Sequence, residues 1–200
     1  NDTLTYALSG TDAGDFTFNS STKALTFTAT PDRENPVDSD TDNVYTVIVT
    51  VTDDGAGTLT GTQTLTVTVT NVNETPTDIA LDNLTLAEET ASGSDVGTLT
   101  STDVDDGDTA TYSLIAGTGS EDNANFTIVG DKLKLAFTPD YENPTDAGDT
   151  ALNNTYSVRV RVTDGGSETY EEIFVISITN VNDAPEITSN GGGATAAISV

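Results

Sequence analysis

The sequence predicts an all-β fold of tandem seven-strand Greek-key β-sandwiches, of the cadherin or immunoglobulin-like kind, and three observations carry this prediction. Apolar and polar residues alternate along well-defined runs, which is the pattern of half-buried antiparallel strands. Clusters of Gly and Asp separate the runs, as turns between strands do. The same series of segments occurs twice along the chain, which indicates a repeated unit.

The alternation is clearest in three runs. In residues 45–52, Tyr and Val occupy the odd positions and Thr and Ile the even ones. Residues 64–70 continue with Leu and Val against Thr, and residues 156–162 place Tyr and Val against Ser and two Arg. β-Branched residues in this order favour strands, and the stretches 53–55 and 164–166 that follow supply turn residues. No amphipathic helix of useful length is expected.

Four segments of the first half return in the second half at an offset of 106 to 111 residues. The paired segments are 2–8 with 108–114, 27–36 with 137–144, 49–53 with 160–164, and 71–76 with 180–185. A unit of about 109 residues suits a seven-strand sandwich, which takes roughly 100 residues.

The positions at which the repeated segments begin and end predict the domain boundaries. Residues 1–76 are a repeat lacking its first strand, 77–184 are a complete repeat, and 185–200 begin a third. A repeat without its opening strand would present an open sheet edge, which residues 194–200 of a neighbouring chain could fill by strand addition. The simpler interpretation is that a longer natural chain was cut.

The composition argues against several classes of function. There are 33 Asp and Glu against six Lys and Arg, giving a net charge of −27, which excludes nucleic acid as a natural partner. The chain has neither His nor Cys, so it lacks the common nucleophiles, a proton shuttle active near neutral pH and the usual zinc ligands. An enzyme is not expected. No apolar run is long enough for direct membrane insertion.

The acidic residues gather in loops with a regular spacing. Asp103 and Asp105 lie two residues apart before a Gly turn, and D-x-E motifs stand at 32–34 and 140–142. The segments 71–76 and 180–185 each add one acid and two Asn. Ca²⁺ takes six to eight oxygen ligands and tolerates irregular geometry, so these loops predict calcium sites.

With these motifs in this order, the sequence resembles the cadherin-like tandem repeats of large bacterial cell-surface adhesins. The resemblance rests on the two D-x-E motifs, the D-x-D motif at 103–105, the two N-V-N-[ED]-x-P segments and the early Glu88. It covers both repeats and implies seven-strand sandwiches whose junctions bind up to three Ca²⁺.

The resemblance also implies which residues hold the ions. For the internal junction they are Asp32, Glu34, Asn71, Asn73, Glu74, Asp103, Asp105, Asp108 and Asp164. At the far end of the second repeat, half a site is implied for Glu88, Asp140, Glu142, Asn182 and Asp183.

The function implied is a calcium-rigidified structural or extender segment of an extracellular bacterial adhesin or surface filament, which mediates cell adhesion at the cell surface. Its partners would be neighbouring repeats of the same chain or end-to-end copies, together with surface glycans or another cell. Extracellular modules bind Ca²⁺ at about 10⁻⁴–10⁻³ M, a range that extracellular calcium saturates.

The alternative is a carbohydrate-binding module. Such a module exposes aromatic rings, and Tyr141 and Tyr170 are the candidates, although packing at the end of a sandwich also explains them. The Thr-rich run at 62–70 suggests ice binding as a third function, but the corresponding segment of the second repeat is not Thr-rich. Two carboxylates of a glycosidase would need an apolar pocket that raises one pKa, and nothing in the sequence marks such a pair.

Overall fold

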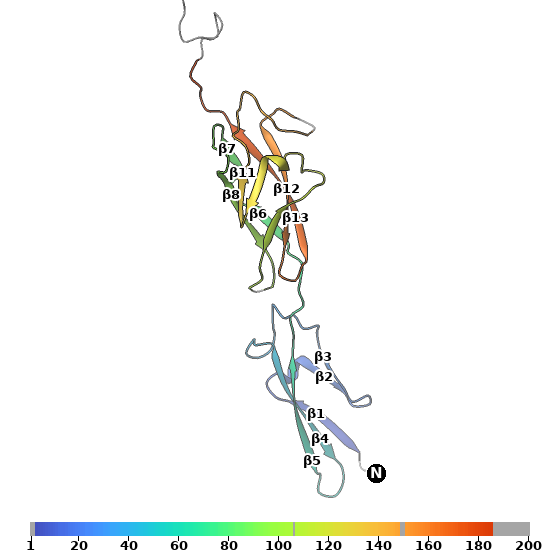
Figure 1. Cartoon of the computed structure of the whole chain (residues 1–200). Helices are drawn as coiled ribbons and strands as arrows, with labels where there is room; N and C mark the ends of the chain where they lie inside the picture. The colour runs from blue at the N-terminus through green and yellow to red at the C-terminus, as the bar shows by residue number, and fades with distance from the viewer. Residues whose placement is uncertain (1–2, 106, 149–150, 186–200) are drawn as a thin grey trace, which may run out of the picture. The chain divides into compact units, whose positions relative to one another are not determined.

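The computed structural model describes residues 3–105, 107–148 and 151–185, and it is nearly all β (Figure 1). The predicted all-β class is confirmed. The chain divides into two compact units, the first formed by residues 1–74 with 103–108 and the second by 75–102 with 109–200. Of the third repeat predicted at 185–200, all but Pro185 lies outside the described residues.

The first unit holds five described strands and one short 3₁₀ turn. They are β1 (Leu4–Ser9), η1 (Ala13–Asp15), β2 (Phe16–Asn19), β3 (Ala24–Phe27), β4 (Val44–Asp53) and β5 (Thr60–Thr68). β4 lies in the middle of a three-stranded sheet of order β1-β4-β5, and both of its pairings are antiparallel. β2 and β3 form a separate antiparallel hairpin.

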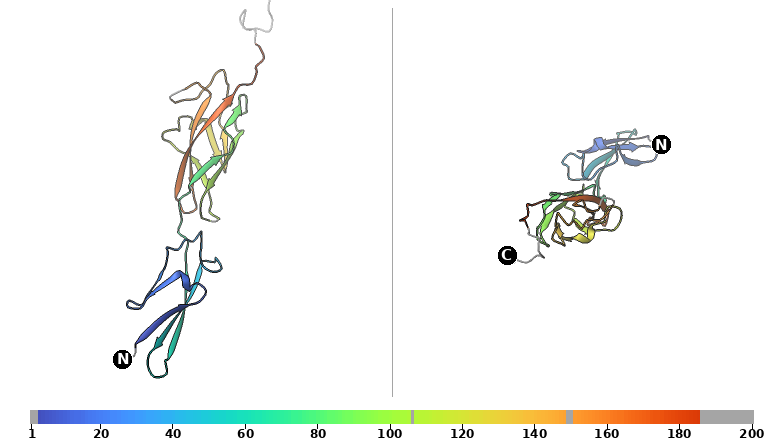
Figure 2. Two further views of the ribbon diagram at one scale, coloured as in Figure 1. Left: turned by 180° about the vertical axis from the view of Figure 1, so that it is seen from behind. Right: turned by 90° about the horizontal axis from the view of Figure 1, so that it is seen from above.

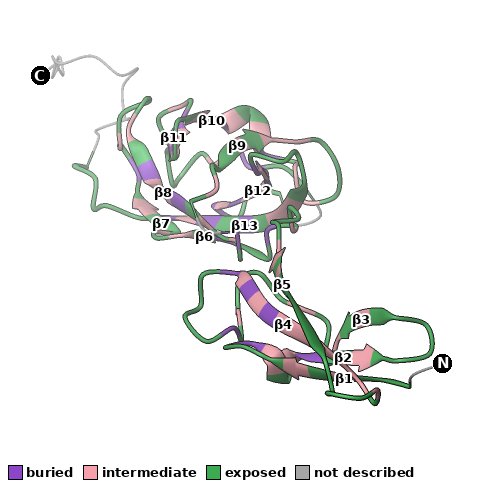
Figure 3. Ribbon diagram, turned by 90° about the horizontal axis from the view of Figure 1, so that it is seen from below, coloured by how far each residue is buried: buried purple, intermediate pink, exposed green. Residues whose placement is uncertain are grey.

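Aromatic rings join the sheet of the first unit to its hairpin. Phe16 of β2 and Tyr45 and Val47 of β4 are the buried core residues, and buried and half-buried positions alternate at the start of β4 (Figure 3). Phe27 of β3 stacks at 4.5 Å from Phe16 and meets Tyr45 edge-on at 5.1 Å, measured between ring centroids. Such pairs add to the free energy that area burial alone supplies.

The second unit begins with β6 (Asp78–Leu81), β7 (Thr85–Ala87), β8 (Asp95–Thr102) and β9 (Thr111–Leu114). It continues with η2 (Asn123–Asn125), β10 (Phe126–Val129), β11 (Lys132–Leu135), β12 (Thr155–Thr163) and β13 (Thr169–Thr179). One sheet has the order β10-β11-β8-β6 and the other β7-β13-β12-β9. Figure 2 shows the strands of this unit from two further sides.

The first strand of this sandwich is divided between the two sheets. β6 runs antiparallel to β8, whereas β7 runs parallel to β13 in the other sheet. Asn83 lies at the crossing, where its amide nitrogen donates to the Val96 carbonyl at 2.8 Å and to the Thr85 carbonyl at 2.9 Å. Counting β6 and β7 as one divided strand, the unit is a seven-strand Greek-key sandwich.

Both sheets of the second unit contribute to one buried core. Ile79, Leu99 and Leu133 face it from one sheet, and Tyr156, Val160 and Val162 of β12 join the same cluster from the other. The equivalent positions on β4 in the first unit, Val49 and Val51, are only half-buried. The described part of the first unit has no counterpart to β6 and β8, whose Ile79 and Leu99 belong to the same core cluster as Val160 and Val162.

The outer face of β12 carries an ion-pair network. Arg159 Nε donates to Glu171 Oε2 at 3.1 Å, and Arg161 Nε donates to Glu171 Oε1 at 3.0 Å. The two guanidinium groups hold the pKa of Glu171 below its ordinary value. Because the folded pKa is lowered, the stabilisation is present above the ordinary Glu pKa and is lost as the pH falls through the folded pKa.

Replacing Glu171 by Gln is therefore expected to lower the melting temperature at pH 7 and to have a smaller effect near pH 2, because acid shifts the wild-type carboxyl toward its protonated form. Melting followed by far-ultraviolet circular dichroism at both pH values measures this. Glu121→Gln removes an exposed acid of the same unit and is the control. Equal melting temperatures for Glu171→Gln and Glu121→Gln at pH 7 would show that the network contributes nothing.

Candidate metal sites

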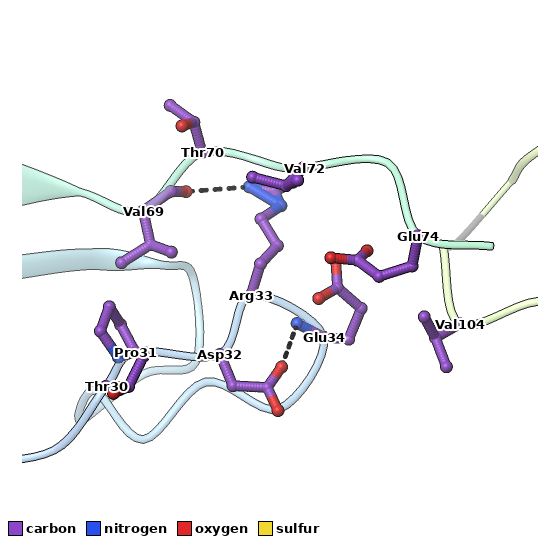
Figure 4. A pocket seen from close by; sticks show the side chains of 10 residues that line it. All are labelled: Thr30, Pro31, Asp32, Arg33, Glu34, Val69, Thr70, Val72, Glu74 and Val104. Carbon is purple, nitrogen blue, oxygen red and sulfur yellow. Dashed lines mark hydrogen bonds between the residues drawn. The ribbon is translucent and has the colours of Figure 1, made fainter. Parts of the chain in front are cut away.

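Three carboxylates converge in the first unit. Glu34 lies in the loop after β3, Glu74 follows β5, and Asp105 belongs to the segment 103–108. Each offers one carboxylate oxygen, and the three oxygens lie within 4.8 Å of one another. Figure 4 shows the carboxyl groups of Glu34 and Glu74 turned toward each other. All three residues belong to the ligand set expected from the sequence.

The D-x-E motif folds into a turn that presents Glu34. Asp32 Oδ1 accepts hydrogen bonds from the Glu34 N–H at 3.0 Å and the Asn35 N–H at 3.1 Å. Arg33 Nη1 donates to the Val69 carbonyl at 3.2 Å, which fastens the loop to the chain after β5 (Figure 4). Asp32 thus shapes the loop, and its carboxylate is not one of the three converging groups.

Asp105 is held in place by two donors. Asn71 Nδ2 donates to Asp105 Oδ1 at 2.7 Å, and the Glu74 N–H donates to Asp105 Oδ2 at 2.8 Å. These donors lower the pKa of Asp105. Asn71 therefore turns its amide nitrogen toward the cluster, and Asn73 donates its own amide to the Glu74 carbonyl at 3.1 Å.

The electrostatics of this cluster are unfavourable without a cation. Burial raises the pKa of Glu74, and the charges of Asp105 and Glu34 raise it further. Glu74 Oε2 and Asp103 Oδ2 are buried and have no hydrogen-bond partner among the described residues. Buried oxygens with no donor cost free energy, and a bound cation would supply the missing partner.

A pocket of about 490 Å³ opens beside Glu34 and Glu74 (Figure 4). Its described lining is Thr30, Pro31, Asp32, Arg33, Glu34, Val69, Thr70, Val72, Glu74 and Val104. This set contains no aromatic ring on which a sugar could stack. Of the two tyrosines expected as sugar contacts, Tyr141 is 38% exposed, while Tyr170 is half-buried and donates its hydroxyl to Glu172 at 3.2 Å. Carbohydrate binding stays a prediction.

A second cluster of expected ligands forms in the second unit. Glu88, Asp140 and Glu142 each offer a carboxylate oxygen, and these oxygens lie within 4.8 Å of one another. Burial raises the pKa of Glu142, and the charges of Glu88 and Asp183 add to that effect. Asn182 donates its amide to the Asp183 carbonyl at 3.3 Å.

Glu88 is also a structural acceptor. It is 4% exposed and accepts hydrogen bonds from the Val181 N–H at 2.6 Å and the Tyr141 N–H at 2.7 Å. The two donors lower the pKa of Glu88. The side chain therefore ties the end of β7 to the chain after β13, whether or not a cation is bound.

The remaining expected ligands occupy turns in one unit or the other. In the first unit, Asp103 Oδ1 accepts from the Asp105 N–H at 3.0 Å, and the Asp108 N–H donates to the Asp105 carbonyl at 3.3 Å. In the second unit, Asp164 is 8% exposed and accepts from the Glu168 N–H at 2.8 Å. Metal ligation by these three residues stays a prediction.

Two further carboxylates are deeply buried for structural reasons. Asp12 Oδ1 accepts from the Ser39 N–H at 2.9 Å, and Asp12 also accepts from Thr46 of β4. Asp122 in the second unit accepts from the Ala147 N–H at 2.7 Å and the Ser157 N–H at 2.8 Å. Each acid therefore fastens the loop that precedes β4 or β12 to the strand itself.

The chain is similar to solved cadherin structures. It matches the EC1-2 part of human protocadherin-24 with a TM-score of 0.64 and 21% identity, over 92% of this chain and 84% of that one. For EC1-4 of Drosophila N-cadherin the TM-score is 0.61 at 20% identity, over 90% and 41% of the two chains. The fold is that of cadherin extracellular domains.

Longer cadherin fragments are covered only in part. The chain spans 40% of the protocadherin gammaB7 EC3-6 chain, from a cis-dimer structure, with a TM-score of 0.62 and 19% identity over 88% of this chain. It spans 26% of the protocadherin gammaB4 extracellular domain. The sequence matches no protein-family model and no curated protein. Within the described residues, no helix of this cadherin-like chain has the length and apolar character needed to span a membrane.

Proposed function

We propose that the chain is a calcium-binding structural segment of an extracellular bacterial adhesin or surface filament that mediates cell adhesion. Its units act as tandem cadherin-like repeats, and Ca²⁺ at the repeat junctions makes the segment rigid. The observation that supports this most strongly is the cluster of Glu34, Glu74 and Asp105, in which an oxygen of Glu74 is buried with no hydrogen-bond partner among the described residues.

The donor set fits a hard cation. All the converging groups are carboxylates, and the chain has no Cys or His to favour a softer metal. Weak binding, at about 10⁻⁴–10⁻³ M, would leave the sites filled outside a cell and empty in the cytosol.

The connectivity supports a stiffening role. Residues 103–108 belong to the first unit, whereas the chain on both sides of them belongs to the second. A cation on Asp105 would therefore restrain a segment that is covalently tied to the second unit at both ends. Glu88, Asp140 and Glu142 would act in the same way toward a following repeat or an end-to-end copy of the chain.

Small-angle X-ray scattering of the whole chain tests this function. In millimolar Ca²⁺ the maximum dimension is expected to rise and the particle to become stiffer, compared with the chain in EGTA. The double variant Glu34→Gln with Asp105→Asn is expected to lose this response and to keep both folds. The charge-matched control is Glu121→Gln with Asp131→Asn, two exposed acids outside every cluster.

Scattering curves of the wild-type chain that superimpose in EGTA and Ca²⁺ would contradict a stiffening role. A full Ca²⁺ response in the Glu34→Gln/Asp105→Asn variant would show that other residues bind the ion responsible.

A further inference from the structure

A third group of acids lies in the loop before β4, in the first unit. Asp38, Asp40 and Asp42 stand at alternate positions, and each offers a carboxylate oxygen within 4.8 Å of the other two. Asp38 is 3% exposed, while Asp40 and Asp42 are exposed. The group shares no residue with the cluster of Glu34, Glu74 and Asp105.

The buried member of the group has an oxygen that nothing in the described chain satisfies. Asp38 Oδ2 accepts from the Asp42 N–H at 2.9 Å, but Asp38 Oδ1 is buried and has no hydrogen-bond partner. The exposed carboxylates of Asp40 and Asp42 converge with that of Asp38. A buried carboxylate oxygen therefore faces added negative charge instead of a donor, which is costly unless a cation is present.

At the equivalent position of the second unit, both oxygens of the buried acid have hydrogen-bond donors. Asp146 is also 3% exposed, but its Oδ1 accepts from the Asn154 N–H and its Oδ2 from the Asn153 N–H, both at 3.0 Å. Both oxygens of Asp146 are therefore satisfied by the backbone. Asp38, at the equivalent place in the first unit, has one oxygen without a hydrogen-bond donor.

The surroundings establish that Asp38 and Asp146 are equivalent. Asn43 and Asn154 both end their loops at a left-handed backbone angle, with φ of 66° and 64°. Asn43 Nδ2 donates to the Arg33 carbonyl at 3.0 Å, and Asn154 Nδ2 donates to the Tyr141 carbonyl at 2.9 Å.

The loop lengths explain the difference. Asn43 comes five positions after Asp38, whereas Asn154 comes eight positions after Asp146. The shorter loop supplies one backbone donor to Asp38 and brings two more carboxylates beside it.

We propose that the loop of residues 38–43 is a separate Ca²⁺ site, held by the carboxylates of Asp38, Asp40 and Asp42. Asp38 supplies the buried ligand, and the exposed side of the loop leaves room for water ligands. Ca²⁺ fits better than Mg²⁺ because the acids belong to an irregular loop, and Mg²⁺ demands near-ideal octahedral geometry. This site does not depend on calcium at the repeat junctions. It would brace the loop that Asp12 ties to the sheet through Ser39.

Nuclear magnetic resonance of the whole ¹⁵N-labelled chain, titrated with Ca²⁺ up to 10 mM, tests the proposal residue by residue. The amide signals of residues 39–43 are expected to shift and to saturate. In the variant Asp40→Asn with Asp42→Asn, these shifts are expected to disappear. Asn at position 42 keeps an oxygen for the Val44 N–H, which Asp42 Oδ1 accepts at 2.8 Å, so the loop fold is retained.

Two comparisons show whether the chemical-shift changes come from binding at residues 38–43. Glu121→Gln with Asp131→Asn removes the same charge and is expected to leave the saturating shifts in place. Signals near Glu34 and Glu74 report on the proposed junction site separately, so either site can fail alone. Shifts at 39–43 that grow linearly without saturation, or that persist in Asp40→Asn/Asp42→Asn, would overturn the proposal.

Discussion

Replacing Asp122 by Ala is expected to lower the free energy of unfolding of the second unit by about 3 kcal/mol, because two buried donors lose their acceptor. Asp122 is 1% exposed and accepts from the N–H groups of Ala147 and Ser157. A buried donor left unsatisfied costs about 1–3 kcal/mol, and water has little access to this position.

Urea unfolding in EGTA, followed by far-ultraviolet circular dichroism, measures this effect without any contribution from calcium. Asp122→Asn is expected to give an intermediate loss, because its amide keeps one acceptor oxygen. Asp131→Ala removes an exposed acid and is expected to change the free energy of unfolding by about 0.5 kcal/mol or less. An Asp122→Ala protein as stable as Asp131→Ala would show that the buried carboxylate does not hold the loop.

The strands were the most predictable part of the fold. Residues 45–52 and 156–162 alternate strictly, and the structure makes them the middle strands β4 and β12. The division of the first strand of the second unit into β6 and β7 was not predictable, because it involves a hydrogen bond from Asn83 to Val96 on the neighbouring strand β8. Periodicity reports which face of a strand is apolar and not which sheet the strand joins.

The acidic loops were predictable as a group but not acid by acid. Glu34, Glu74 and Asp105 converge as the motifs suggested, whereas Asp32 is used to shape its own turn. Asp38, Asp40 and Asp42 also converge, and their alternate spacing was a signal that the sequence interpretation passed over.

Burial separates the roles of these acids. Asp122 becomes a structural acceptor only because the start of η2 lies against β12, a contact between residues 35 positions apart. Spacing along the chain carries no information on such long-range contacts. The same limit applies to Asp38. That one of its oxygens lacks a donor becomes apparent only by comparison with Asp146, whose oxygens both accept hydrogen bonds.

Calcium is expected to stabilise the whole chain by about 1.4–2.7 kcal/mol for each filled site at 10 mM Ca²⁺. This range follows from RT ln(1 + [L]/Kd) with dissociation constants of about 10⁻³–10⁻⁴ M. The physical reason is that a bound cation offsets the burial and the carboxylate repulsion that together raise the pKa of Glu74 and Glu142. A gain of this size in a domain of roughly 100 residues corresponds to a rise in melting temperature on the order of 10 °C.

The most direct measurement is a thermal melt of the whole chain in 1 mM EGTA and in 10 mM Ca²⁺ at constant ionic strength, with 10 mM Mg²⁺ as the control for simple screening. We expect Ca²⁺ to raise the melting temperature by about 10 °C, and Mg²⁺ to raise it much less. The same melting temperature in all three solutions would contradict calcium binding by these carboxylates, and the acidic loops would then be ordinary solvated surface.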